Sequence, residues 1–253
     1  LGSRRAVFER TFLPAGFPNS VPREYLSYQK CHVVQDLATQ LRNTLATQRV
    51  LTGLGVGSAD ASAVSAITSW ILRDGAGMLS SLVFTSFNSE AFGSNVRSWR
   101  FFADCAVDIG IFCEMAAGSF FGGSGSYPIF LALLCLGSVF KALCGVAAGA
   151  ANSAITLHFT QGGERSRSGS NDKLGSSTGG KHRRGVDIGE IAAKGGAVGT
   201  LSGTLGLVLS LALARTTTSP WAWFWGLTMV GAEKACLVPI CMHQNKACFL
   251  PNE

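Results

Sequence analysis

Apolar side chains recur at helical spacing after the first two dozen residues of the chain. From Arg23 onward, large apolar residues alternate with charged and amide residues. The apolar positions are Tyr25, Leu26, Val33, Val34, Leu37, Leu41 and Leu45. This period predicts an amphipathic helix that ends before Gly53. The preceding segment, 1–24, contains Pro14, Pro18 and Pro22 and is predicted to be extended.

Shorter apolar stretches follow, separated by polar turns. Residues 61–72 are predicted to be helical, with Asp60 placed to cap the first turn. The Arg73-Asp74-Gly75-Ala76-Gly77 sequence is expected to break this helix before a second apolar stretch at 78–87. A polar loop is expected at 88–95, and a long helix over 96–121.

The predicted helix over 96–121 carries a stripe of charge on an otherwise largely apolar sequence. At 100° per residue, Arg97, Arg100, Asp104 and Asp108 fall within about 80° of one another. Arg100 and Asp104 are four residues apart and are expected to pair, which neutralises the Asp104–Asp108 carboxylate pair. Such a helix fits a bundle in which its charges face protein or water and not lipid.

Two longer apolar segments have the length of membrane spans. Residues 128–157 contain a single charge, Lys141, and residues 196–214 contain none. As a helix, the second segment would extend about 28 Å, close to the thickness of the hydrocarbon core of a bilayer. Glycines at four-residue intervals predict close helix packing at Gly145, Gly149, Gly195, Gly199 and Gly203.

Composition favours lipid over water around these helices. Charged residues are 14% of the chain and hydrophobic residues 47%, with 31 glycines, whereas typical soluble domains have roughly 25% charged residues. We therefore predict an all-α, multi-helix membrane-embedded bundle with an amphipathic N-terminal helix. The alternative is a buried helical subunit of a soluble assembly. The expected parts are 1–24, 25–159 with the first span or spans, 160–185 as a connector, and 186–253.

The formal net charge of +6 is concentrated in the connector. Six basic residues oppose Glu164 and Asp172 there, so this segment alone supplies +4. The basic residues are Arg165, Arg167, Lys173, Lys181, Arg183 and Arg184. Nucleic-acid binding would favour interleaved aromatic residues, but serines and glycines fill the gaps. A flexible, solvated loop on the positive side of a membrane is the preferred interpretation, with no nucleic-acid partner.

Two sequence features could indicate a chemical function, but their surroundings do not support one. The glycines of Gly53-Leu54-Gly55-Val56-Gly57 follow a predicted helix and not a strand, which favours helix packing over nucleotide binding. Cys236, Cys241 and Cys248 lie near His243, but their spacing matches no common zinc module, and free, disulfide-bonded and metal-bound states stay open. No nucleophile–base pair is evident. We expect no catalytic residues, cofactor or metal.

Several short motifs resemble the root UVB sensitive family, in the family's order over about residues 11 to 210. They are Leu13-Pro14-x-Gly16-Phe17-Pro18-x-Ser20-Val21 with Tyr25-Leu26-x-Tyr28-Gln29, Gly55-Val56-Gly57, Trp70-Ile71-Leu72-Arg73-Asp74-Gly75-x-Gly77-Met78, Trp99-Arg100-x-x-Ala103-Asp104-x-x-x-Asp108, Gly145-Val146, His158 and Ala193-Lys194-Gly195. The resemblance implies a helical, membrane-associated organellar protein with no established enzymatic activity. Plant members are plastid proteins tied to light stress and vitamin B6 homeostasis.

The chain departs from this family at several polar positions. It has Ala150-Ala151-Asn152 where Ala-Thr-Arg is usual, Ala197-Val198 where Ser-Gln is usual, and Gly93 where an Asp is common. Because polar positions are lost while packing glycines are kept, we expect a scaffold or accessory subunit of a larger membrane complex. The expected partners are the lipid bilayer and other membrane subunits. The expected location is an organellar membrane, with the plastid favoured over the mitochondrion.

The alternative function is a membrane carrier or homeostasis factor for a small metabolite such as a B6 vitamer. A small-molecule ligand would then meet charged residues along a polar path, since intramembrane charges often mark one. Structural ion pairing is the simpler interpretation of these charges. The candidate functional positions are Trp70, Arg73, Asp74, Arg100, Asp104, Asp108 and Lys194.

Overall fold

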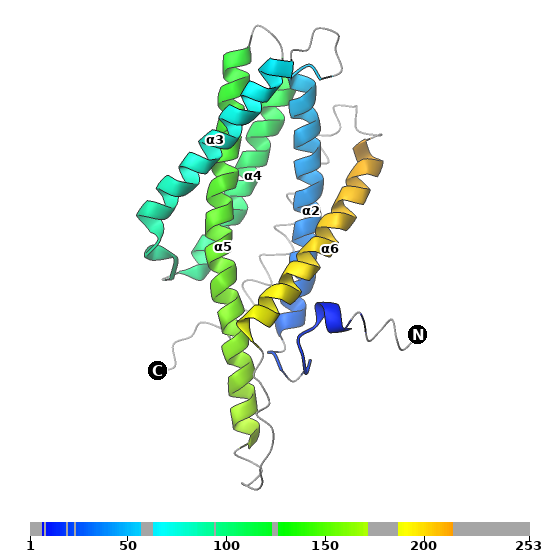
Figure 1. Cartoon of the computed structure of the whole chain (residues 1–253), viewed down its shortest axis with the longest axis vertical. Coiled ribbons are helices and arrows are strands. Elements are labelled where there is room, and N and C mark those ends of the chain that lie inside the picture. The colour runs from blue at the N-terminus through cyan, green and yellow to red at the C-terminus, as the bar shows by residue number, and fades with distance from the viewer. Residues whose placement is uncertain are drawn as a thin grey trace. The chain divides into compact units, whose positions relative to one another are not determined.

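The described part of the chain is helical throughout its regular structure. The computed structural model describes residues 7, 9–18, 20–22, 24–56, 63–93, 95–122, 126–171 and 187–214. The elements are α2 (Glu24–Gly53), α3 (Ala63–Asn88), the 3-10 helix η1 (Ala91–Gly93), α4 (Val96–Phe120), α5 (Tyr127–Asn171) and α6 (Ile188–Ala214) (Figure 1). These ranges contain no strand, which confirms the all-α prediction for them.

The chain divides into two compact units. Among the described residues, the first unit comprises those within 1–38 and 155–208, and the second those within 39–154 and 209–214. Helices α3 and α4 belong wholly to the second unit. There they lie beside α5 and the end of α2.

Two helical segments, Tyr127–Gln161 and Ile188–Ala212, are long and apolar enough to cross a membrane. In each segment, only 22% of the apolar 18-residue stretch that defines it is buried inside the structure. A helix that is apolar all round is normally buried, either in a protein core or in a membrane. Most residues of these two stretches are therefore only partly covered, or are exposed, among the described residues.

Helix α3 is continuous through the Arg73–Gly77 sequence, so the expected break there is wrong. Gly77 lies against α5, where a methyl group would come 2.5 Å from the Ser138 hydroxyl oxygen. The glycine thus lets two helices approach closely, and it does not end the helix. The amino-terminal segment also differs from expectation, because residues 9–12 are helical before the first proline, Pro14.

The glycines after α2 form a helix end. The Gly55 N–H donates to the Thr52 carbonyl at 3.0 Å and the Val56 N–H donates to the Leu51 carbonyl at 3.1 Å. Gly55 has a φ of 75°, the left-handed conformation that this type of helix cap requires. Gly55 therefore caps α2, which explains this glycine without a phosphate ligand.

Close contact between α2 and α4 depends on Gly53 and Gly118. A methyl group at Gly118 would fall on the Arg49 backbone carbonyl, and one at Gly53 would lie 3.1 Å from the Gly118 Cα. The predicted packing glycines behave differently. Among the described residues, a methyl group at Gly145, Gly149, Gly195 or Gly203 would meet no atom within 4 Å, and one at Gly199 would meet only Asp36.

Aromatic side chains join α3 to α4 across the loop expected at 88–95. The Trp99 ring lies 4.8 Å from the Phe92 ring and 5.9 Å from the Phe102 ring, centroid to centroid. Its indole N–H donates to the Ala91 carbonyl at 3.0 Å. Trp99, part of the Trp-Arg motif, therefore has a structural role in fixing this turn.

In the first unit, Tyr25 forms the centre of a small core with Phe159 and Ile191. The Tyr25 and Phe159 rings meet edge to face at 5.3 Å. Burial raises the pKa of the Tyr25 hydroxyl, and the hydrogen bond from Gln29 acts in the opposite direction.

The connector predicted over 160–185 begins within the last turns of α5, because that helix reaches Asn171. Residues 172–186 lie outside the described residues.

Two matched alanine substitutions test the contact between α2 and α4. Gly118→Ala should lower the free energy of unfolding by about 1–3 kcal/mol, because the new methyl group meets backbone that cannot rotate away. Gly145→Ala should leave stability unchanged or raise it by up to about 1 kcal/mol, because alanine favours a helix. Reversible unfolding in mixed micelles, followed by circular dichroism, measures both. Equal stability of the two variants would contradict the contact.

Candidate functional site

A buried carboxylate in the second unit faces cations from two other helices. Glu114, on α4, is 1% exposed. The Arg73 Nη2, from α3, lies 3.1 Å from one Glu114 carboxylate oxygen. The Lys141 ammonium, from α5, donates to the other oxygen. These three side chains form the Glu114 cluster, which carries a formal charge of +1.

Glycines on both helices make room for the Glu114–Lys141 pair. A methyl group at Gly137 on α5 would lie 3.0 Å from the Glu114 Cγ, and one at Gly110 on α4 would lie 2.9 Å from the Lys141 Cγ. Each charged side chain therefore passes over a glycine of the other helix. The sequence holds a matching signal, because glycine precedes the charged residue by four positions on both helices.

Arg73 is also held by an aromatic ring on its own helix. Its guanidinium carbon lies 4.4 Å from the centroid of the Trp70 ring, within the range of a cation–π interaction. Trp70 packs against the core formed by Val50, Ala117 and neighbouring residues. The Trp70 and Arg73 side chains, which belong to the family-like motif over 70–78, therefore lie toward the interior of the unit.

A second buried pair lies between α2 and α4. The Arg42 guanidinium, whose side chain is 1% exposed, donates to the Asp108 carboxylate and also to the Thr39 hydroxyl at 3.2 Å. Asp108 therefore has a partner on another helix, in addition to the neutralisation by Arg100 that the sequence predicted. The sequence pattern placed Arg42 on the polar face of an amphipathic helix, so its buried position was not predicted.

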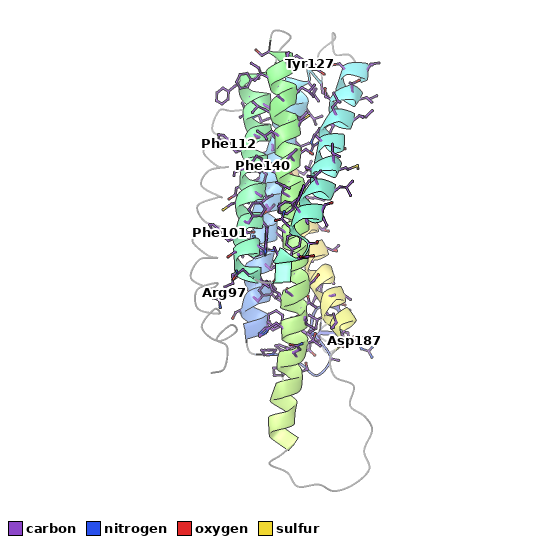
Figure 2. All side chains as sticks on the ribbon, turned by 90° about the vertical axis from the view of Figure 1, so that its left-hand side faces the viewer. Arg97, Phe101, Phe112, Tyr127, Phe140 and Asp187 are labelled. Carbon is purple, nitrogen blue, oxygen red and sulfur yellow. The ribbon has the colours of Figure 1, made fainter. Side chains whose placement is uncertain are left out.

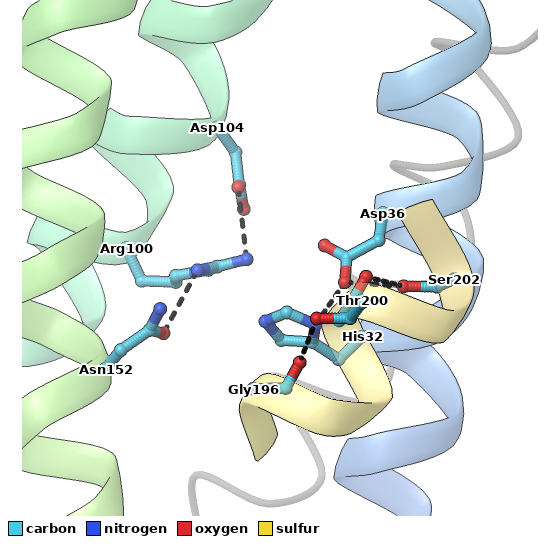
Figure 3. Close-up of polar contacts among 9 residues, drawn as sticks. His32, Asp36, Arg100, Asp104, Asn152, Gly196, Thr200 and Ser202 are labelled. Carbon is cyan, nitrogen blue, oxygen red and sulfur yellow. Dashed lines mark hydrogen bonds and ion pairs between the residues drawn. The ribbon is translucent and has the colours of Figure 1, made fainter. Parts of the chain in front are cut away.

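Arg100 instead joins α4 to α5 (Figure 3). Its guanidinium lies 3.6 Å from the Asp104 carboxylate, which confirms the predicted spacing, and donates to the Asn152 side-chain oxygen at 3.3 Å. Asn152 stands where the family resemblance implied an arginine. An amide at this position accepts a hydrogen bond from Arg100, whereas a second guanidinium would repel it.

The first unit contains a separate polar group between α2 and α6. One Asp36 carboxylate oxygen accepts a hydrogen bond from the Ser202 hydroxyl at 3.0 Å and lies 3.0 Å from the His32 Nδ1 (Figure 3). These residue types also occur in hydrolase triads, but in a triad the serine bonds to histidine. Here the serine bonds to the carboxylate, so the arrangement fixes α6 and does not activate a nucleophile.

The candidate positions do not form one site. Trp70 and Arg73 join the Glu114 cluster, while Asp104 and Asp108 belong to two separate ion pairs. Asp74 is exposed. Lys194 lies in the first unit, where it donates to the Arg10 carbonyl. Within the described ranges, no three metal-binding side chains are grouped closely enough to hold a metal ion.

Comparison with known proteins gives one family. The family model of the vitamin B6 photo-protection and homoeostasis domain matches residues 3–167. RUS family member 1 of Dictyostelium discoideum is 39% identical over 150 residues, which cover 59% of this chain and 28% of that protein. Protein root UVB sensitive 3 of Arabidopsis thaliana is 31% identical over 224 residues, covering 87% of this chain and 44% of that protein.

A third relative carries a location in its name. Protein root UVB sensitive 2, chloroplastic, of Arabidopsis thaliana is 28% identical over 213 residues, covering 84% of this chain and 42% of that protein. The chain thus spans less than half the length of these relatives. No solved structure matches the chain.

Removing the central carboxylate tests whether the cluster stabilises the second unit. Glu114→Gln should destabilise the protein by about 3–5 kcal/mol, because it leaves Arg73 and Lys141, both partly buried, without their carboxylate partner. Adding Lys141→Met should recover part of this loss by removing one of those cations. Unfolding in mixed micelles measures both variants.

The matched control is Glu90→Gln, because Glu90 is an exposed acid on the same unit. Its effect should stay within about 0.5 kcal/mol. Equal effects of Glu114→Gln and Glu90→Gln would show that the ion pairs of the cluster contribute nothing to stability.

Proposed function

Since the chain belongs to the root UVB sensitive family, we propose that it is a non-enzymatic organellar membrane protein that contributes to vitamin B6 homeostasis as an accessory subunit of a larger membrane complex. The match of residues 3–167 to the vitamin B6 photo-protection and homoeostasis domain supports the link to vitamin B6. The chloroplastic relative supports the plastid over the mitochondrion.

The observation that carries this proposal is the outward-facing apolar surface of the helices. Phe101 and Phe112 point away from the neighbouring helices of the second unit and are 64% and 55% exposed (Figure 2). Covering one large apolar side chain is worth about 1.5–3 kcal/mol. On α3 alone, nine large apolar residues are exposed: Val64, Ile67, Ile71, Leu72, Met78, Leu79, Leu82, Val83 and Phe87. Lipid and partner helices supply such cover, and water does not.

The charges of the second unit support a structural role. Asp108 and Glu114 face cations from other helices at ion-pair distance, and Asp104 faces Arg100 on its own helix. Paired charges between helices are the form in which ionisable groups are tolerated inside a membrane. These pairs therefore suit a protein that holds helices together and assembles with others.

Extraction and native migration test the proposal together. The full chain in organelle membranes should resist extraction by alkaline carbonate, because apolar helices bind lipid without depending on surface charge. After mild detergent it should migrate on a native gel well above the mass of one 26.5 kDa chain in its micelle. Release by carbonate would contradict the membrane assignment, and migration as a monomer would contradict the accessory-subunit role.

A second function, a carrier for a B6 vitamer, is favoured by the excess positive charge of the Glu114 cluster. Two cations face one carboxylate, and the Arg73 Nε is buried with no hydrogen-bond acceptor among the described residues. The phosphate of a phosphorylated vitamer would pair with the excess positive charge and accept a hydrogen bond from the Arg73 Nε. The Arg73 and Lys141 side chains are 18% and 22% exposed, which leaves them accessible to a small anion.

Vesicle uptake distinguishes this carrier from a subunit. In proteoliposomes, Lys141→Met should lower uptake of pyridoxal 5′-phosphate by about tenfold, the effect of about 1.4 kcal/mol of lost attraction. Uptake of unphosphorylated pyridoxine serves as the internal control and should stay unchanged. Equal uptake of both compounds by wild type and variant would remove the cluster from any transport function.

A further inference from the structure

Asp74, a carboxylate on the exposed side of α3, borders a row of exposed apolar side chains. It is exposed, and no hydrogen bond or ion pair joins it to a described residue. At 100° per residue, its apolar neighbours fall within about 80° of it on the helix surface. They are Ile67, Ile71, Met78 and Leu82, which are 58%, 65%, 69% and 67% exposed. These four residues and Asp74 form the Asp74 face.

Neither lipid nor water is a suitable environment for this face. At 1.5 Å per residue, Asp74 lies about 17 Å from one end of α3 and about 21 Å from the other, near the middle of the helix. A carboxylate that faces hydrocarbon at the centre of a membrane helix costs about 2.5–3.5 kcal/mol. Water would solvate the carboxylate but would leave the four apolar side chains uncovered.

Gly75, next to Asp74, is a second observation that points outside the chain. It is exposed in a helix interior, and a methyl group there would meet no described atom within 4 Å. A glycine at such a position costs about 1 kcal/mol relative to alanine. Gly77 on the same helix is explained by its contact with Ser138, but the described residues give Gly75 no such contact. A small residue at 75 allows a helix from another protein to approach closely.

We propose that the Asp74 face binds an apolar helix of a different membrane protein, which places a lysine or arginine opposite Asp74. The apolar residues of that helix would cover the four apolar side chains, and its cation would pair with the carboxylate. A second copy of this chain fits less well. A two-fold axis through the face would bring it against itself and place the two Asp74 carboxylates close together. The inference rests on the proposed function, because it assumes that α3 lies in a membrane.

Site-directed photocrosslinking in organelle membranes tests the inference with the full chain. A photoreactive residue at Met78 should yield an adduct with one partner protein. The crosslinked peptide should come from an apolar helix that contains a lysine or arginine. Asp74→Asn should lower the yield of this adduct by about tenfold, as expected for about 1.4 kcal/mol of lost pairing. Glu90→Gln is the control and should not change the yield.

Charge exchange gives an independent readout once the partner peptide is known. Asp74→Lys should abolish the adduct, and replacing the partner's basic residue by aspartate should restore it. The inference is overturned by adducts with lipid alone, with a second copy of the chain, or with the chain's own residues 215–253. An adduct that Asp74→Asn leaves unchanged overturns it as well.

The two proposals fail in distinguishable ways. Release of the chain by alkaline carbonate would overturn the proposed function and this inference together. A chain that stays in the membrane and migrates in a large complex, but whose crosslinking does not depend on Asp74, would overturn the inference alone.

Discussion

Glu114 lies 1% exposed between helices that are otherwise mostly apolar, and this single carboxylate links three of them. A buried carboxylate without a cation would be strongly destabilising, so Arg73 and Lys141 constrain where α3 and α5 pass α4. The Arg42–Asp108 pair applies the same constraint between α2 and α4. Helix order within the second unit therefore depends on charge pairing as well as on apolar contact.

The glycines that allow helix backbones to approach closely are those beside the paired charges and those near the helix ends. Gly110 and Gly137 let the α4 and α5 backbones approach while Glu114 and Lys141 cross between them. Gly118 performs the same role where α2 meets α4. Ionic and steric requirements are thus met at the same positions, because a larger residue at 110 or 137 would push the paired charges apart.

The helices were largely predictable because their signal is local. The expected helices over 23–52, 96–121, 128–157 and 196–214 correspond to α2, α4, α5 and α6. The break predicted at Arg73–Gly77 was wrong because tertiary contacts override local preference. Arg73 is held by Glu114, and Gly77 fits against Ser138.

The site was less predictable because pairing between helices has no local spacing rule. Arg100 and Asp104 were found since they lie one turn apart, whereas Arg42 with Asp108 and Arg73 with Glu114 connect different helices. Repeated glycine spacing alone pointed to Gly145 and Gly149, where an added methyl group would meet no described atom within 4 Å. The informative pattern was a glycine four residues before a charge, present on both α4 and α5.

The central claim is that a paired ionic cluster lies inside the hydrocarbon region. Trp70 reports its depth directly, because Arg73 lies 4.4 Å from the centre of its ring. A variant that keeps Trp70 and replaces the other four tryptophans by phenylalanine would be reconstituted in vesicles that contain lipids brominated at defined depths. The account predicts that bromines near the middle of the acyl chains quench Trp70 fluorescence most strongly. Quenching by aqueous iodide, with no effect of the brominated chains, would contradict it.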